Sequence, residues 1–157
     1  MLNYNFFDKQ LHRQFLGDNS LSDYFYKKLL LDSEKTKNNF PNHIFVTGLA
    51  RSGTTATLNK IYASGELASF LYRYMPFVLS PSLAKIYSSF ATKKNKINNR
   101  LHNDGIKVGI DSPECLDEIF WIKSDKNISD LSKRENLTAN KYNLKAYSFL
   151  LEAFAKL

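Results

Sequence analysis

The sequence has little of what marks secreted or membrane proteins. Its single cysteine, Cys115, excludes an internal disulfide, which is typical of a reducing compartment. No stretch approaches the roughly 18 consecutive apolar residues of a membrane-spanning helix, so we expect no membrane span. The first residues, MLNYNFFDKQLHRQF, include an acid and have no continuous apolar core, unlike a secretory signal. We therefore expect a cytoplasmic protein in which Cys115 packs against a helix.

The chain of 157 residues is long enough for one domain with a real core, and its net charge is +7. A positive balance can attract nucleic acid, acidic membranes or small anions. The lysines of residues 93–100 are scattered among asparagines, as on a solvated face, and no aromatic-basic motif for nucleic acids appears. We expect no nucleic-acid partner.

Apolar periodicity and turn residues predict both helices and strands. Helices are expected at residues 21–31, 54–62, 76–90, 112–123 and 143–157. The fourth begins at Ser112-Pro113-Glu114, a serine cap followed by a first-turn proline and an acid. The last helix places one apolar face at Leu144, Tyr147, Leu151 and Phe154. Strands are expected at residues 43–48 and 67–72, with a weaker one at 106–110.

A strand, a loop, a helix and a second strand within about 30 residues form a βαβ unit, whose sheet is parallel. The fold class is therefore α/β. A parallel sheet buries both faces, and two good strands with a weak third rarely complete one. We expect one partial domain over residues 1–157, with a helical segment at 1–40 before the βαβ unit and later helices of 43–157. An open sheet edge would favour self-association, or the domain lacks a C-terminal half.

The residues between the first strand and its helix have the pattern of a phosphate-binding loop. Backbone N–H groups and the helix dipole converge there on an anion. Gly48 and Gly53 permit close approach, and Arg51 offers a charged planar fork of donors. The loop for nucleoside triphosphates is GxxxxGK[ST], but Thr54 occupies its lysine position. The pattern thus suits a single phosphate better than a triphosphate with magnesium.

The stretch FVTGLARSGTT resembles the 5′-phosphosulfate loop of the sulfotransferases, a strand followed by G-x-x-[RK]-S-G-T-T. The stretches YRYMPFVLSP and DGIKVGIDSPECLDEIFW are similar to a bacterial branch of that family, so the resemblance covers residues 40–122. It implies a P-loop NTPase-like parallel sheet flanked by helices that binds 3′-phosphoadenosine 5′-phosphosulfate (PAPS). It also implies transfer of the sulfuryl group, without a metal, to a hydroxyl or amine of a small-molecule or glycan acceptor. By position, Arg51 would contact the 5′-phosphate and the sulfuryl group, and the phosphate would be bound by Gly48, Ser52, Gly53, Thr54 and Thr55.

Two family features are missing from the sequence. No strand followed by an arginine and a serine for the 3′-phosphate is found after Thr55. The glutamate that one branch places downstream of the loop as a base is also absent, because residues 71–74 read Leu-Tyr-Arg-Tyr. We therefore expect the chain alone to have little or no turnover.

Three residues remain as candidate bases: His102, Asp111 and Glu114. Asp111 follows the weak strand, so it would lie at the carboxyl edge of a sheet, where such folds bind ligands. Each has a plainer interpretation: an exposed histidine for His102, an acid at a helix start for Asp111, and a helix-dipole partner for Glu114.

Two other functions stay open. In a nucleotide kinase or NTPase, the stretch VGID would supply a magnesium-binding aspartate, although Thr54 in place of lysine opposes this. Alternatively, the chain is a non-catalytic remnant or interaction module that keeps only part of the fold.

Overall fold

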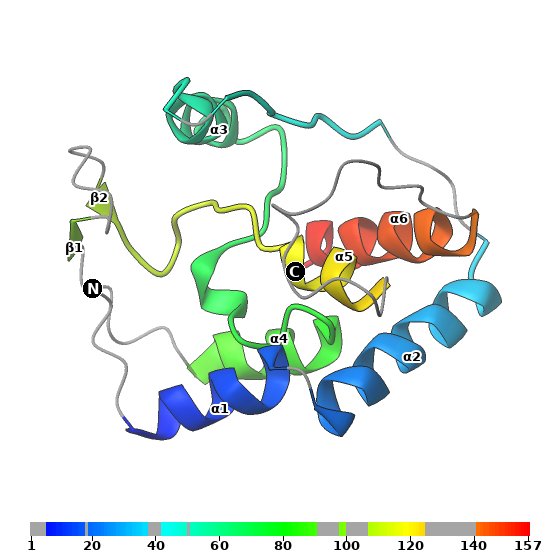
Figure 1. The fold of residues 1–157 in the computed structure, drawn as a ribbon. Helices are drawn as coiled ribbons and strands as arrows, with labels where there is room; N and C mark the ends of the chain where they lie inside the picture. The colour runs from blue at the N-terminus through cyan, green and yellow to red at the C-terminus, as the bar shows by residue number, and fades with distance from the viewer. Residues whose placement is uncertain are drawn as a thin grey trace.

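The computed structural model describes residues 6–17, 19–37, 42–49, 51–90, 98–99, 107–124 and 141–157. These residues are mostly helical (Figure 1). The α-helices are α1 (Phe6–Leu16), α2 (Ser20–Lys35), α3 (Thr54–Tyr62), α4 (Pro81–Phe90), α5 (Glu118–Ser124) and α6 (Lys141–Ala155). A 3-10 turn, η1, covers Tyr72–Tyr74, and the strands are β1 (Asn98–Asn99) and β2 (Lys107–Val108). Among the described helices, none is long and apolar enough to cross a membrane.

Local sequence signals place several of these helices correctly. The predicted helix at 54–62 is confirmed as α3. The helix at 21–31 is confirmed within α2, where the side chain of Asn19 caps the first turn by accepting hydrogen bonds from the N–H groups of Leu21 and Ser22. The helix predicted at 76–90 begins later, at Pro81, because residues 75–79 form turns and the Ser80 carbonyl receives the first helical hydrogen bond from Ala84.

The predicted helix start at Ser112-Pro113-Glu114 is wrong, since α5 begins only at Glu118. The backbone of this segment pairs with residues 70–73 instead. The N–H of Tyr72 donates to the Ser112 carbonyl at 3.2 Å, and that of Glu114 donates to Phe70 at 3.1 Å. An antiparallel bridge joins Leu71 and Pro113. Tertiary pairing therefore overrides a strong local helix signal.

The predicted parallel sheet is absent from the described part of the chain. The sheet present there has two strands, and β1 and β2 pair antiparallel with Asn98 opposite Val108. Residues 43–48 are without assigned secondary structure, and residues 67–72 contribute only the single bridge at Leu71. Residues 107–108 of the weak strand at 106–110 are in β2. A parallel sheet depends on neighbouring strands from distant parts of the chain, which no local pattern guarantees.

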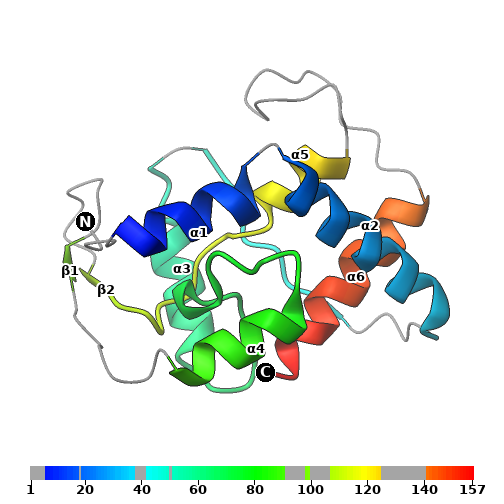
Figure 2. The same cartoon turned by 90° about the horizontal axis from the view of Figure 1, so that it is seen from below.

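The core lies among α2, α4, α5, α6 and the turns of residues 70–79, which together with α1 we call the helical body. Helices α2 and α6 lie side by side (Figures 1 and 2). The side chains of Phe120, Leu150 and Val78 are fully buried. On α6 the predicted face is partly wrong: Tyr147 and Phe154 are buried with Ala146 and Leu150, but Leu144 is 50 % exposed.

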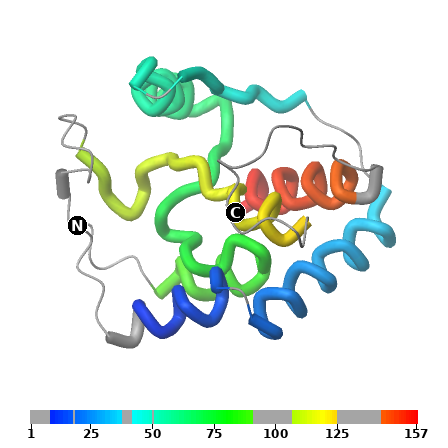
Figure 3. Tube along the Cα trace, in the orientation of Figure 1, coloured from blue at the N-terminus to red at the C-terminus, as the bar shows by residue number. Residues whose placement is uncertain are grey.

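Residues 42–49 and 51–66 form a second region, which we call the loop arm. It contains α3, and α3 stands apart from the helical body (Figures 1 and 3). Helix α3 has no buried residue, and Leu49 is 85 % exposed. The arm meets the body through Tyr62, which packs against the core, and through the ring of Phe45, which lies against Tyr147.

Candidate anion-binding loop

The residues that lead into α3 form a tight turn. The N–H of Ser52 donates to the Leu49 carbonyl at 3.1 Å, and the N–H of Thr57 donates to Gly53 at 3.0 Å. Gly53 has a φ of 86° and Arg51 a φ of 67°, both in the left-handed region. This region is open to glycine but costs a residue with a side chain about 1–2 kcal/mol. Such backbone outliers cluster at functional sites, so Arg51 becomes a candidate from geometry as well as from sequence.

Gly48 allows the turn to close. A Cβ at this position would lie 2.5 Å from the Ser52 hydroxyl oxygen, so any side chain there would displace Ser52. The side chain of Ser52 thus packs closely over Gly48 inside the loop.

The N-terminus of α3 has no side-chain cap. Its N-cap is Gly53, which has no side chain to cap the helix, and no acidic residue lies in the first turn. The first N–H groups of a helix lack partners within the helix and carry the positive end of its dipole. An anion placed there would receive several backbone donors at once.

The side chains around this N-terminus are accessible. Arg51, Ser52 and Gly53 are exposed, and Thr54 and Thr55 are half-buried. Arg51 makes no ion pair with any residue that the structure describes. The loop residues predicted from the sequence thus lie just before α3 and in its first turn.

Two of the candidate bases are held within the helical body. The guanidinium of Arg73 donates to Oδ1 of Asp111 and forms an ion pair with it. Oε2 of Glu114 accepts a hydrogen bond of 2.8 Å from the Tyr72 hydroxyl, and Oε1 accepts one of 3.2 Å from the N–H of Cys115. Glu114 is not in the first turn of a helix as predicted. His102 lies outside the described residues.

Asp111 also affects the titration of Tyr74 in η1. The pKa of Tyr74 is raised mainly by burial; the Arg73 charge opposes this, and Tyr62 and Asp111 add to it. Tyr62 ends α3, and the eight-residue rise from Thr54 to Tyr62 spans about 12 Å. Tyr62, the residue of the arm that packs against the core, is therefore far along α3 from the turn.

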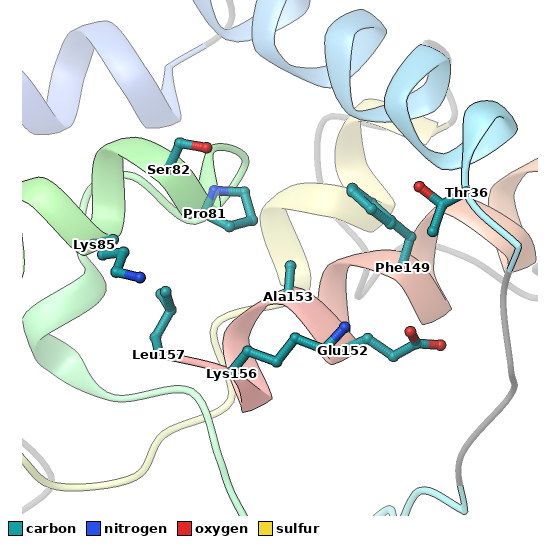
Figure 4. Close-up of a pocket in the computed structure, with 9 residues that line it drawn as sticks. All are labelled: Thr36, Pro81, Ser82, Lys85, Phe149, Glu152, Ala153, Lys156 and Leu157. Atoms are coloured by element: carbon teal, nitrogen blue, oxygen red, sulfur yellow. The ribbon is translucent and has the colours of Figure 1, made fainter.

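A hollow of about 320 Å³ lies between α4, α6 and the C-terminal end of α2 (Figure 4). Its lining residues are Thr36, Pro81, Ser82, Lys85, Phe149, Glu152, Ala153, Lys156 and Leu157. None of the site residues predicted from the sequence is among them. The hollow is thus a feature of the helical body and separate from the loop.

Sequence reasoning missed a polar cluster around Asp117. Its carboxylate accepts hydrogen bonds from the Tyr147 hydroxyl at 2.7 Å, the Trp121 indole N–H at 3.2 Å and the Cys115 thiol at 2.8 Å. Burial and then the hydrogen bond to Asp117 raise the pKa of Tyr147, and they raise the pKa of Cys115 to about 12. The four-residue spacing of Asp117 and Trp121 is a local signal that sequence reasoning could have used. No sequence signal links Asp117 to Tyr147.

No group of three or more histidine, cysteine, aspartate or glutamate side chains that could hold a metal occurs among the described residues. Comparisons of the chain with protein-family models, with curated proteins and with solved structures found no match. The functional argument accordingly rests on the loop itself.

Proposed function

We propose that the loop arm binds the phosphosulfate end of PAPS and that the protein is a sulfotransferase. Its reaction is transfer of the sulfuryl group to a hydroxyl or amine of a small-molecule or glycan acceptor. The observation that carries this proposal is the turn before α3, where Arg51 and Gly53 have left-handed backbone conformations and the helix N-terminus has no side-chain cap. The resemblance of this turn to the family's 5′-phosphosulfate loop supports the choice of donor.

The residues of the turn suit a tetrahedral oxyanion. The planar fork of Arg51 can donate two parallel hydrogen bonds to one such group, whereas a lysine acts as a point charge. Backbone N–H groups at the start of α3 and the hydroxyls of Thr54 and Thr55 are further donors. With Thr54 in the lysine position, the group that reaches the β- and γ-phosphates of a triphosphate is missing.

The same groups have a chemical task in sulfuryl transfer. Negative charge builds up on the departing 5′-phosphate as the bond to sulfur breaks, and donors fixed beforehand stabilise that charge without reorganising. The remaining requirement is alignment of the acceptor oxygen or nitrogen with sulfur. His102, Asp111 and Glu114 stay candidates for the base that removes the acceptor's proton.

Calorimetry with two nucleotides tests this proposal. The protein should bind adenosine 3′,5′-bisphosphate in the presence of EDTA, because the loop supplies its own positive charge. Binding of ATP only with magnesium would replace the proposal with a nucleotide kinase or NTPase. Failure to bind either nucleotide would leave a non-catalytic interaction module. Where the bisphosphate binds, transfer of labelled sulfate from PAPS to a panel of hydroxyl and amine acceptors measures turnover.

A further inference from the structure

Phe45 occupies an unusual position just before the loop. It lies three residues before Gly48, and its side chain is 63 % exposed. Its ring nevertheless stacks on Tyr147 of α6, with 6.2 Å between the centroids and 24° between the planes. The centroid of the His43 ring lies 6.3 Å from that of Phe45. The stack of this exposed ring on a distant helix attaches the loop arm to the helical body.

The partner of Phe45 is firmly held. Tyr147 is buried, and its hydroxyl donates to Asp117 at 2.7 Å. The rings of Trp121 and Phe120 lie 4.7 Å and 5.3 Å from its ring, within the range of favourable aromatic pairs. Asp117 also accepts the indole N–H of Trp121. Tyr147 therefore presents a fixed face to Phe45.

The loop arm has little other support close to the turn. Helix α3 has no buried residue, and the contact of Tyr62 with the core lies at the far end of that helix. The stack of Phe45 on Tyr147 is one attachment on the N-terminal side of the turn, where His43 is also half-buried. Its loss would free the segment that leads into Gly48.

We propose that Phe45 and Tyr147 are positioning residues of the anion-binding loop, with Asp117 orienting Tyr147. The proposal rests on the proposed function for its ligand, adenosine 3′,5′-bisphosphate. The contact between Phe45 and Tyr147 and its effect on the loop can be measured without any ligand. Trp121 is the single tryptophan of the chain, and it packs on Tyr147 from the body side. Its fluorescence consequently reports on the Phe45 stack.

The test compares Phe45→Ala with Ile44→Ala, because Ile44 is the neighbouring apolar residue and is 61 % exposed. Phe45→Ala should weaken bisphosphate binding about threefold to tenfold, the worth of an aromatic pair, and should shift Trp121 emission. Ile44→Ala should change neither, and Phe45→Tyr should restore both because it keeps the ring. Equal affinities of Phe45→Ala and Ile44→Ala would overturn the proposal.

Hydrogen exchange of the free chain separates this proposal from the proposed function. In Phe45→Ala the amides of Ser52 and Thr57, which bond to Leu49 and Gly53, should exchange faster than in Ile44→Ala. Faster exchange in a chain that binds no bisphosphate would reject the proposed function and keep the positioning role. Unchanged exchange in a chain that does bind the bisphosphate would reject the positioning role alone.

Discussion

The helical body and the loop arm differ in the burial of their side chains and in the pairing of their charges. In the body, Phe120 and Leu150 are fully buried, and its cations Lys123 and Arg73 are paired with carboxylates. In the arm, α3 buries no residue, and Arg51 forms no ion pair with any described residue. The body is therefore stabilised by packing, and the arm presents its backbone donors and its arginine to solvent. The difference suits the proposed function, in which the helical body supports the loop arm and the arm binds the anion.

The conformation of the arm has a cost that the body does not share. Arg51 has a positive φ, which disfavours a side chain, and in the described residues it is the one non-glycine residue with that property. Such strain persists only where neighbouring structure or function maintains it. The proposed binding of an anion by its guanidinium would account for an arginine at this strained position.

The largest effect should come from shortening the same side chain in the two regions. Leu150→Ala removes a fully buried leucine of α6 and should lower the free energy of unfolding by about 2–5 kcal/mol. Leu49→Ala changes an 85 % exposed leucine of the arm and should stay within about 0.5 kcal/mol. Urea denaturation measures both. Similar losses would show that the arm is packed as tightly as the body.

A smaller effect is expected from a charge pair inside the body. The Lys123 ammonium lies 2.8 Å from Asp23, with the lysine side chain 6 % exposed and the aspartate 48 %. Asp23→Asn leaves a buried ammonium without that carboxylate, and unfolding free energy should fall by about 1–3 kcal/mol, reduced by the exposure of Asp23. The control is Asp32→Asn, which removes the exposed pair with Lys28 and should cost under about 0.5 kcal/mol. Equal losses would contradict the role given to burial.

The smallest of these effects concerns Cys115, an exposed cysteine whose thiol donates to Asp117 at 2.8 Å. With its pKa raised to about 12, the thiol is protonated at pH 8, so iodoacetamide should react at least about tenfold more slowly than with a free cysteine. Because folding raises the pKa of this thiol, its contribution to stability also depends on pH. The contribution is present below the pKa of the unfolded chain and is lost as the pH rises toward 12. Asp117→Asn removes the charge that favours the protonated thiol and should speed alkylation. A rate equal to that of free cysteine would show that the bond to Asp117 does not form.

Helix α3 was predictable because its signals are local: two glycines before it, a threonine pair at its start, and Ser64 and Gly65 after it. Residues 112–114 carried an equally strong local signal, yet they are extended, because their backbone pairs with residues 70–72. Propensity gives way where distant partners supply the hydrogen bonds.

The contacts between the candidate site and the helical body could not be predicted from local sequence patterns. The contact of Phe45 with Tyr147 joins residues about a hundred positions apart, and no local pattern pairs the two. The prediction of a parallel sheet was wrong for the described residues because each strand was predicted from its own residues, without knowledge of its pairing partner. A local pattern can single out a candidate binding turn, but contacts between distant residues are visible only in the structure.

The affinity of adenosine 3′,5′-bisphosphate for Arg51→Ala, compared with Lys60→Ala, tests the central claim most directly. Both residues are exposed cations of the arm, but Arg51 lies in the turn and Lys60 in the last turn of α3. By calorimetry in EDTA, Arg51→Ala should weaken binding about tenfold or more, the worth of a charge-assisted hydrogen bond, and Lys60→Ala less than about twofold. Equal weakening by the two variants, or unchanged affinity in a folded Arg51→Ala protein, would contradict the assignment of Arg51 to the site.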